Sequence, residues 1–542
     1  MMTPFTGTGR LVRLALRRDR IQLPSWLVGL SLILWVTVSS IVGFYPGEAE
    51  RVRLAMTSAH SPVTLMTNGL VSGASLGATV MTQAFVSLAV GAALMSILAV
   101  VRHTRQNEET GRAEMIGAGI VGRDASLTAA LITVALANLV LVAASVLVLV
   151  ASGLPLGGSV LCGLGIGAVG LAFAAIAAVT AQIAETSRGA NALAVAALGI
   201  AFVLRAVGDA SGKVIDGGLS VVSAWPTWLS PIGWGQQSRA FDRDQWWVLG
   251  ILALFVVVLV SGAFVLASRR DLGAGMRAVR PGRPAAAPAL LSPSGLAWRL
   301  HRGVLIGWAA GVAVLGASYG GVADEISEML SDSPEIAQYF EQLGGASLTD
   351  TFFAVTMSVA GIAAAAYAVQ ATLRMRSEEA AGRVEPLLGT AVSRPRWMAA
   401  NIGVVALGTL VLMVVAGVTA GVVYGLVVGD VGSNVTTLIG AALVQVPAAL
   451  VLAGVAVAAF GLLPRWAAAI SWASFAACLV VLQLGVILDL PQAVLDLSPF
   501  THVPAAPAED ATALPLFALL TAAVALTAVG ITAFRRRDLA LP

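Results

Sequence analysis

The chain has 542 residues, of which 58% are hydrophobic and only 11% charged, and its mean hydropathy is +0.88. Soluble domains carry about 25% charged residues, so this composition excludes an ordinary soluble enzyme and indicates a membrane protein. In a membrane protein, basic residues indicate which side of the membrane a loop occupies, so the net charge of +3 does not point to nucleic-acid binding. We expect no nucleic-acid partner. The two cysteines, Cys162 and Cys478, lie in apolar runs, which argues against a disulfide framework or a thiolate metal centre.

The N-terminal residues are basic and apolar by turns. Residues 10–20 read RLVRLALRRDR, and on a helix their leucines cluster with arginines beside them. This pattern predicts an interfacial amphipathic helix within residues 1–25, lying on an anionic inner leaflet, although a plain positive flank for the first span would look similar. Residues 26–268 then hold six apolar runs long enough to cross a bilayer. These predicted spans are 26–45, 76–101, 126–152, 158–183, 189–209 and 246–268.

A second set of six spans follows a stretch rich in Pro, Ala and Gly. Residues 269–302 are expected to form a cytoplasmic linker and connecting helix, residues 303–534 a second six-helix half, and residues 535–542 a cytoplasmic tail. Segment 321–350 contains seven acidic residues and no basic one, and its apolar spacing predicts short amphipathic helices outside the membrane. The predicted spans of this half are 303–320, 350–373, 397–428, 434–462, 466–488 and 512–534.

The two halves are copies of one another. Residues 105–123, RQNEETGRAEMIGAGIVGR, and residues 376–394, RSEEAAGRVEPLLGTAVSR, are identical at seven of nineteen positions, whereas chance gives about one or two. We call these the first and second duplicated segments. The tetrad RRDL also occurs twice, at 269–272 and 536–539. The sequence therefore predicts an all-α polytopic membrane protein with 12 transmembrane helices arranged as a tandem 6+6 duplication.

Basic residues fix the expected orientation. With the N-terminus inside, the inner segments hold 26 of the 32 lysines and arginines, which satisfies the positive-inside rule. We therefore expect a multi-pass plasma-membrane protein with both termini in the cytoplasm. Each duplicated segment then joins the second and third spans of its half on the cytoplasmic side.

The duplicated segments carry the chain's most polar shared pattern. On a continuous helix, Glu108 and Arg112 are four residues apart, as are Glu379 and Arg383, and such pairs contribute about 0.2–0.5 kcal/mol each. The segments are either solvated connectors or short surface helices that dock into a partner. Retention of the pattern between the copies favours docking. The candidate docking residues are Glu108, Gly111, Arg112, Glu114, Glu379, Gly382, Arg383 and Glu385.

Several chemistries are absent from the sequence. The only lysine, Lys213, lies in DASGKVID, which lacks the glycine spacing of a phosphate-binding loop, and no segment is long enough for an ATPase domain. No catalytic or metal-binding motif occurs, so we expect neither an enzyme nor a metal protein, and the four histidines are expected in loops. The span interiors lack carboxylates, which argues against proton antiport. Arg205 precedes Asp209 by four residues, which predicts a local ion pair rather than an anion site.

Together these features resemble a known family. Two six-span halves, a basic amphipathic N-terminus and a polar segment between spans 2 and 3 resemble the type-2 ABC exporter permeases. With WLSPIGW (228–234) and RRDLGAG (269–275), the chain resembles the fused actinobacterial tetronasin and polyketide-antibiotic exporter permeases, a group that includes mycobacterial multidrug-efflux permeases.

The resemblance implies a permease that exports hydrophobic or amphiphilic compounds, such as antibiotics, drugs or lipid-like molecules. It implies no cofactor in this chain, and two copies of a separate cytoplasmic ABC ATPase that bind ATP and Mg. Residues around 106–118 and 377–389 would be the coupling helices that dock into those subunits. The copies differ, because Glu109 corresponds to Ala380 and Met115 to Pro386, so the two ATPase contacts need not be equivalent.

The substrate path is predicted only as a set of aromatic and amide side chains within spans, which line a cavity for amphiphiles or pack between helices. A twelve-span secondary transporter is the alternative function, since such proteins also have parallel six-span repeats. A membrane enzyme or assembly scaffold is a third. The substrate-path candidates are Phe352, Phe353, Tyr367, Gln370, Tyr424, Gln445, Trp472, Phe475 and Gln483.

Overall fold

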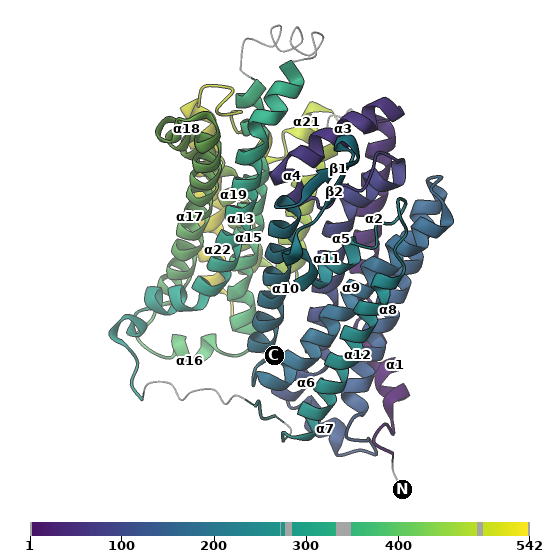
Figure 1. Ribbon diagram of the computed structural model, residues 1–542. Helices are drawn as coiled ribbons and strands as arrows, with labels where there is room; N and C mark the ends of the chain where they lie inside the picture. Colours follow the sequence, from purple (N-terminus) through teal and green to yellow (C-terminus); the bar gives the residue numbers. More distant parts are fainter. Residues whose placement is uncertain (1–2, 272, 277–283, 332–347, 485–490, 540–542) are drawn as a thin grey trace. The chain divides into compact units, whose positions relative to one another are not determined.

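The computed structural model describes residues 3–271, 273–276, 284–331, 348–484 and 491–539. Helices account for most of these residues (Figure 1). The chain divides into two compact units, Met1–Gly282 and Arg283–Pro542, and the boundary falls inside the 269–302 stretch. Among the described residues, eleven helices are long and apolar enough to cross a membrane. The chain is therefore a polytopic helical membrane protein.

Two helices occupy the centre of the first unit. They are α5 (Leu76–His103) and α9 (Leu156–Ile183), which are buried around most of their circumference and pack against each other. Four further helices surround them, and each contacts α5 or α9. Because these outer helices bury only one face, their remaining apolar side chains are left for lipid. The outer helices are α2 (Gln22–Phe44), α8 (Ala125–Ala151), α10 (Ser187–Ala210) and α12 (Trp247–Ser268).

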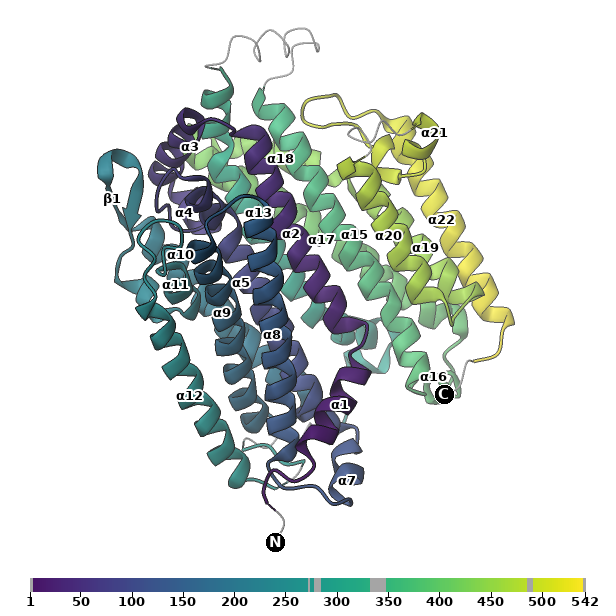
Figure 2. The same ribbon diagram turned by 90° about the vertical axis from the view of Figure 1, so that its right-hand side faces the viewer.

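The first unit carries short elements at both ends. Figures 1 and 2 show α1 (Thr8–Arg18), α6 (Arg105–Glu109) and α7 (Arg112–Gly117) at the end where the N-terminus lies. The opposite end holds α3, α4 and an antiparallel pair of three-residue strands, which the sequence did not predict because such strands are too short to show an alternating pattern. The elements of that end are α3 (Glu48–His60), α4 (Pro62–Thr67), β1 (Lys213–Ile215), η1 (Asp216–Gly218), β2 (Ser220–Val222), η2 (Trp225–Leu229) and α11 (Pro231–Gln236).

The second unit combines three long helices, α13, α15 and α17, with several shorter ones. Its closest neighbours are α13 with α17, α17 with α18, α15 with α19, and α19 with α22. The short helix α16 lies at one end, and α21 with η4 at the other (Figure 2). Its elements are η3 (Pro288–Leu291), α13 (Pro293–Ser331), α15 (Leu348–Ala380), α16 (Val384–Leu388), α17 (Arg394–Val428), α18 (Val431–Leu443), α19 (Val446–Leu462), α20 (Ala467–Leu484), α21 (Gln492–Leu495), η4 (Pro499–His502) and α22 (Ala513–Arg536).

Glycine rows set the closest helix contacts of the second unit. Gly417, Gly421 and Gly425 recur every fourth residue on α17, and a Cβ on Gly421 would lie only 2.6 Å from the Cα of Val435 on α18. In the same way, a Cβ on Gly461 of α19 would lie 2.2 Å from the carbonyl oxygen of a glycine on α22. Small residues let backbones approach where lipid supplies no hydrophobic drive for association. These rows therefore position α17, α18, α19 and α22.

The structure refines three of the predicted spans. The span predicted at 434–462 corresponds to the candidate span Val431–Leu462, which Val444 and Gln445 divide into α18 and α19 just before a proline. The span predicted at 303–320 lies inside α13, which begins ten residues earlier within the predicted linker. The span predicted at 466–488 corresponds to α20, whose described apolar part is shorter than the other eleven. Of the acidic segment 321–350, residues 332–347 lie outside the described residues.

Candidate functional site

The first duplicated segment is not one continuous helix. α6 ends at Glu109, Gly111 adopts a left-handed conformation with φ of 71°, and α7 begins at Arg112. Glycine suits this break because side chains rarely adopt positive φ. Glu108 and Arg112 therefore lie on different helices, and the predicted i,i+4 pair between them is wrong.

Glu108 instead reaches the end of the sixth helix of its unit. Its carboxylate accepts hydrogen bonds from Arg270 at 2.6 and 2.8 Å, and that arginine belongs to the first RRDL tetrad, just after α12. Arg105 donates to the same carboxylate at 2.9 Å, and the backbone N–H of Gly273 also donates to it at 3.2 Å. A forked guanidinium contact of this kind is among the strongest side-chain interactions in proteins. Glu108 therefore fixes α6 to the segment after α12.

The second duplicated segment repeats this contact. α15 continues through Ala380, Gly382 has φ of 68°, and α16 follows. Glu379, whose side chain is only 1% exposed, accepts hydrogen bonds from Arg537 of the second RRDL tetrad at 2.7 and 2.8 Å. Arg383 pairs with Glu378 at 2.7 Å, so the predicted Glu379–Arg383 pair is also wrong. We call Glu108–Arg270 and Glu379–Arg537 the latches of the two units.

The first and last residues of each duplicated segment are arginines that bind the ends of other helices. Arg105 donates to the carbonyl of Ala181 near the end of α9, and Arg376 donates to that of Pro464 just after α19. At the other end of each segment, Arg123 donates to the carbonyl of Ser268 at the end of α12. Arg394 donates to the carbonyl of Phe534 near the end of α22. The last carbonyls of a helix have no partner within it and form the negative end of its dipole. The repeated arginines satisfy them.

The remaining candidates face outward. The side chains of Arg112, Glu114, Arg383 and Glu385 are exposed. Within the described part of the chain, neither Arg112 nor Glu114 forms an ion pair. Each segment therefore has an anchored part, centred on its latch, and an exposed part that follows the glycine. Only the exposed part is free to contact another molecule.

Sequence reasoning missed the latch partners although the signal was present. Both the segment and the RRDL tetrad are duplicated, so Arg270 and Arg537 occupy equivalent positions in the two copies. Two motifs that recur together are candidates for mutual contact. The i,i+4 spacing pairs residues only on an unbroken helix, and each segment is interrupted at its glycine.

The substrate-path candidates do not gather around one site. Phe352, Phe353 and Tyr424 form an aromatic cluster with ring centroids 5.0 to 5.7 Å apart. Gln370 accepts a hydrogen bond at 2.7 Å from Trp308, and Gln445 donates weakly to Ser358.

Three of the other candidates have separate surroundings. Tyr367 is fully buried in the core, next to Gly408 of α17, and Trp472 packs edge-on against Phe475 on α20. The side chain of Gln483 lies outside the part of the chain that is described.

The second unit contains an apolar cavity of about 210 Å³ between α15, α17, α19 and α22. None of the sequence-predicted path residues is among its lining side chains. Its walls are aliphatic apart from two threonines. The lining residues are Thr372, Ile402, Val405, Ala406, Leu450, Ala453, Val457, Leu520, Ala523, Val524 and Thr527.

Arg205 and Asp209 form the expected local ion pair. Both side chains are fully buried, and the guanidinium lies 3.5 Å from the carboxylate. Asp209 also accepts hydrogen bonds from Ser223, Thr227 and Gln236 at 2.6 to 2.9 Å. Arg205 donates as well to backbone carbonyls at the end of α4. The pair ties α10 to the loops around it.

All four histidines lie in helices rather than in loops, contrary to expectation: His60 ends α3, His502 ends η4, and the other two are buried. His103 ends α5, is buried, and lies 2.6 Å from Asp19 through its Nε2 atom. His301 is buried in α13, 3.3 Å from the side-chain oxygen of Asn401.

Comparison with known proteins identifies the family. Residues 290–535 match the family model described as the C-terminal domain of the multidrug efflux system permease Rv1217c. Over 538 residues, the chain is 40% identical to the multidrug efflux system permease protein Rv1217c of Mycobacterium tuberculosis. That alignment covers 98% of this chain and 95% of the relative, so it includes both units and both duplicated segments. The chain is thus a multi-pass membrane protein of the Rv1217c family of multidrug efflux permeases.

Proposed function

We propose that the chain is the membrane-spanning subunit of an ATP-driven ABC exporter for hydrophobic or amphiphilic compounds. A separate ATPase subunit, in two copies, supplies ATP and Mg binding. Both termini and both duplicated segments lie in the cytoplasm, where the exposed parts of those segments contact the ATPase subunits. The closely related relative is named a multidrug efflux permease, which supports export of drug-like compounds.

The latches are the observation that carries this proposal. A helix of five or six residues has no core of its own, so its position depends on what anchors it. In the first unit the anchors are the ends of α9 and α12, and in the second they are the end of α22 and the residue that follows α19. The anchoring side chains lie on α6 and on the last turns of α15, directly before the glycine breaks. A force applied to α7 or α16 by a docked subunit would pass through these residues to the fourth and sixth helices of the same unit. Such a connection is what a transporter driven by an external motor requires.

The two contacts differ in chemistry. Glu109 accepts a hydrogen bond from the backbone N–H of Ser187 at the start of α10, and its counterpart in the second unit is Ala380. Met115 on the exposed side of α7 corresponds to Pro386 in α16. The first segment therefore has an additional tie to the fifth helix of its unit. We expect the two ATPase contacts to be inequivalent.

The positions of the carboxylates favour ATP hydrolysis, rather than an ion gradient, as the energy source for transport. Within the described spans, acidic side chains occur only in the first or last turns. Asp209, the one that is fully buried, is engaged by Arg205 and three further donors. Proton-coupled transport needs an intramembrane group that can release and rebind its proton. A carboxylate held by four partners is poorly suited to that task.

The proposal is tested by reconstituting the purified chain into liposomes with and without the ATPase encoded beside it. We expect no ATP hydrolysis from the chain alone. With the ATPase, export of a fluorescent hydrophobic drug should continue when a protonophore collapses the proton gradient and should stop when ATP is withdrawn. Export that follows the proton gradient and ignores ATP would contradict the proposal and favour a secondary transporter.

A further inference from the structure

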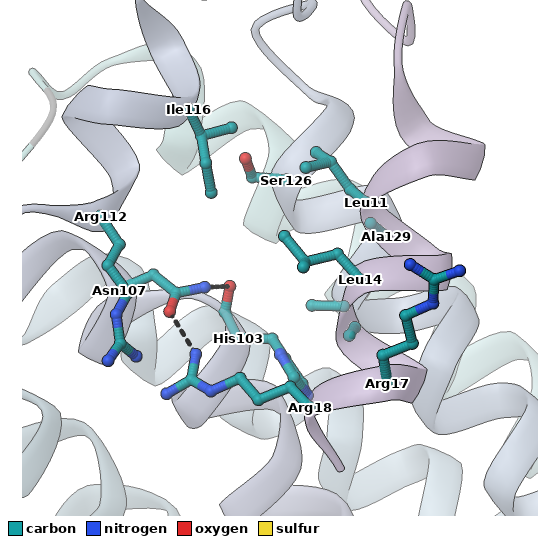
Figure 3. Close-up of a pocket in the computed structure, with 12 residues that line it drawn as sticks. Leu11, Leu14, Arg17, Arg18, His103, Asn107, Arg112, Ile116, Ser126 and Ala129 are labelled. Carbon is teal, nitrogen blue, oxygen red and sulfur yellow. Dashed lines mark hydrogen bonds between the residues drawn. The ribbon is translucent and has the colours of Figure 1, made fainter. Parts of the chain in front are cut away.

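A pocket of about 490 Å³ lies in the first unit between α1, α6, α7 and α8 (Figure 3). Backbone hydrogen bonds hold the residues just before α1 against the loop that follows α7: Gly122 donates to Thr6 at 2.9 Å, and Asp124 donates to Pro4 at 3.0 Å. α1 also packs along α8. The pocket is therefore a fixed feature of this unit, and its volume lies in the range typical of small-molecule sites.

The pocket combines apolar walls with basic side chains. Figure 3 shows Leu11 and Leu14 of α1 and Ile116 of α7 projecting into it. Arg17, Arg18 and Arg112 also line it, with His103 and Asn107 nearby. No carboxylate is among its lining residues. Such a site matches a ligand with an anionic head and an apolar body.

The positive charge of the pocket is not neutralised from within the unit. Arg18 donates to the neutral amide oxygen of Asn107 at 2.6 Å, and burial, followed by repulsion from Arg112 and Arg102, lowers the pKa of Arg18. Asp19 at the end of α1 is already engaged by His103 at 2.6 Å and Arg102 at 3.3 Å.

The acidic residues of α6 and α7 do not line the pocket. Glu108 is held in its latch, and Glu109 accepts from Ser187. Glu114 is exposed on α7 and does not line the pocket. An excess of positive charge in a partly buried site favours an anionic ligand.

The pocket lies where lipid headgroups are expected. α1 is amphipathic, and Leu14 is 54% exposed beside the pocket even though it also lines it. A helix of this kind lies in the membrane interface with its leucines towards the acyl chains and its arginines towards phosphates. In the second unit, α13 runs unbroken from Pro293, whereas in the first unit α1 and α2 are separate helices. The break between α1 and α2 is what lets α1 turn and cover the pocket.

We infer that this pocket binds the phosphate headgroup of an acidic phospholipid. Arg18 and Arg112, whose guanidinium groups lie on the same side of the pocket, bind the phosphate, Arg17 lies at the pocket's rim, and an acyl chain runs along Leu11 and Leu14 (Figure 3). The bound lipid joins α1 to α7, the exposed helix of the first duplicated segment. The inference does not depend on the proposed function, because lipid binding needs no ATPase subunit.

The test uses the full chain purified in a neutral detergent. Native mass spectrometry would measure retention of phosphatidylglycerol and of phosphatidylcholine by the wild type, by Arg17→Gln with Arg18→Gln, and by Arg10→Gln with Arg13→Gln. The control pair lies on the same helix, removes the same charge and is absent from the pocket lining. We expect selective retention of phosphatidylglycerol by the wild type and the control, and at least a tenfold loss of apparent affinity in the pocket variant.

A second measurement, of thermal unfolding, distinguishes loss of lipid binding from misfolding of the variant. Phosphatidylglycerol should raise the thermal unfolding midpoint of the wild type and the control but not that of the pocket variant, whose midpoint without lipid should match the control. Equal phosphatidylglycerol retention in the pocket and control variants would overturn the inference. Stabilisation by inorganic phosphate or glycerol phosphate equal to that by phosphatidylglycerol would also overturn it, because the site would then bind a free phosphate.

Discussion

Replacing Arg537 by alanine is expected to lower the thermal unfolding midpoint of the purified chain by about 10 °C. The side chain of Glu379 is 1% exposed and would lose both hydrogen bonds to the guanidinium. Removing one partner of a buried ion pair costs about 3–5 kcal/mol, which corresponds to such a shift in a unit of this size. Arg537→Lys keeps the charge but not the fork, and we expect an intermediate loss. Differential scanning fluorimetry in detergent measures these shifts.

The matched control is Arg383→Ala, which removes an arginine from the same segment. Arg383 is exposed and pairs with Glu378, so its loss should cost less than about 1 kcal/mol. Exchanging the charges, with Glu379→Arg and Arg537→Glu together, should recover part of the stability. Equal effects of Arg383→Ala and Arg537→Ala would show that the latch has no special structural role.

Reversing the exposed charges of both duplicated segments is expected to reduce ATP-dependent export at least tenfold without lowering thermal stability. The variant carries Glu114→Arg and Glu385→Arg, which lie beyond the glycine breaks and outside both latches. Charge reversal at a docking surface introduces repulsion where attraction was present. Arg112 is left unchanged because it also lines the pocket beneath α1. Export and ATPase capture from reconstituted membranes measure the effect.

The control for this experiment reverses two exposed carboxylates elsewhere, with Glu48→Arg and Asp510→Arg. In each unit that position lies at the end away from the duplicated segment (Figures 1 and 2). Full export in the control and a large loss in the segment variant are expected. Full export and full ATPase capture in both variants would refute the assignment of these segments as docking sites.

The sequence predicted most of the helices because long apolar runs leave few alternatives in a bilayer. It predicted the span at 434–462 but not the local irregularity within it. Only Gln445 and the proline two residues later marked the point where α18 gives way to α19. It also missed the β1–β2 hairpin, whose strands are shorter than any periodic pattern.

For the candidate site, the duplication located both segments but did not reveal their contacts. A two-copy comparison shows which residues recur, yet recurrence does not separate an anchor from a docking surface. The repeated Glu108 and Glu379 are anchors, because each binds an arginine more than 150 positions away. The pocket beneath α1 was equally hidden, since its lining side chains come from α1, α5, α6, α7 and α8, which only the fold brings together.

The central claim, that the exposed parts of the duplicated segments contact an ATPase subunit, is tested most directly by cysteine cross-linking. The native Cys162 and Cys478 are buried, so Met115→Cys and Pro386→Cys would supply the reactive thiols. Val214→Cys and Leu497→Cys, at the opposite end of each unit, serve as controls. We predict that each segment cysteine cross-links to the co-expressed ATPase and that the control cysteines do not. Active ATP-dependent export without any cross-link at the segments, or equal cross-linking at the controls, would contradict this account.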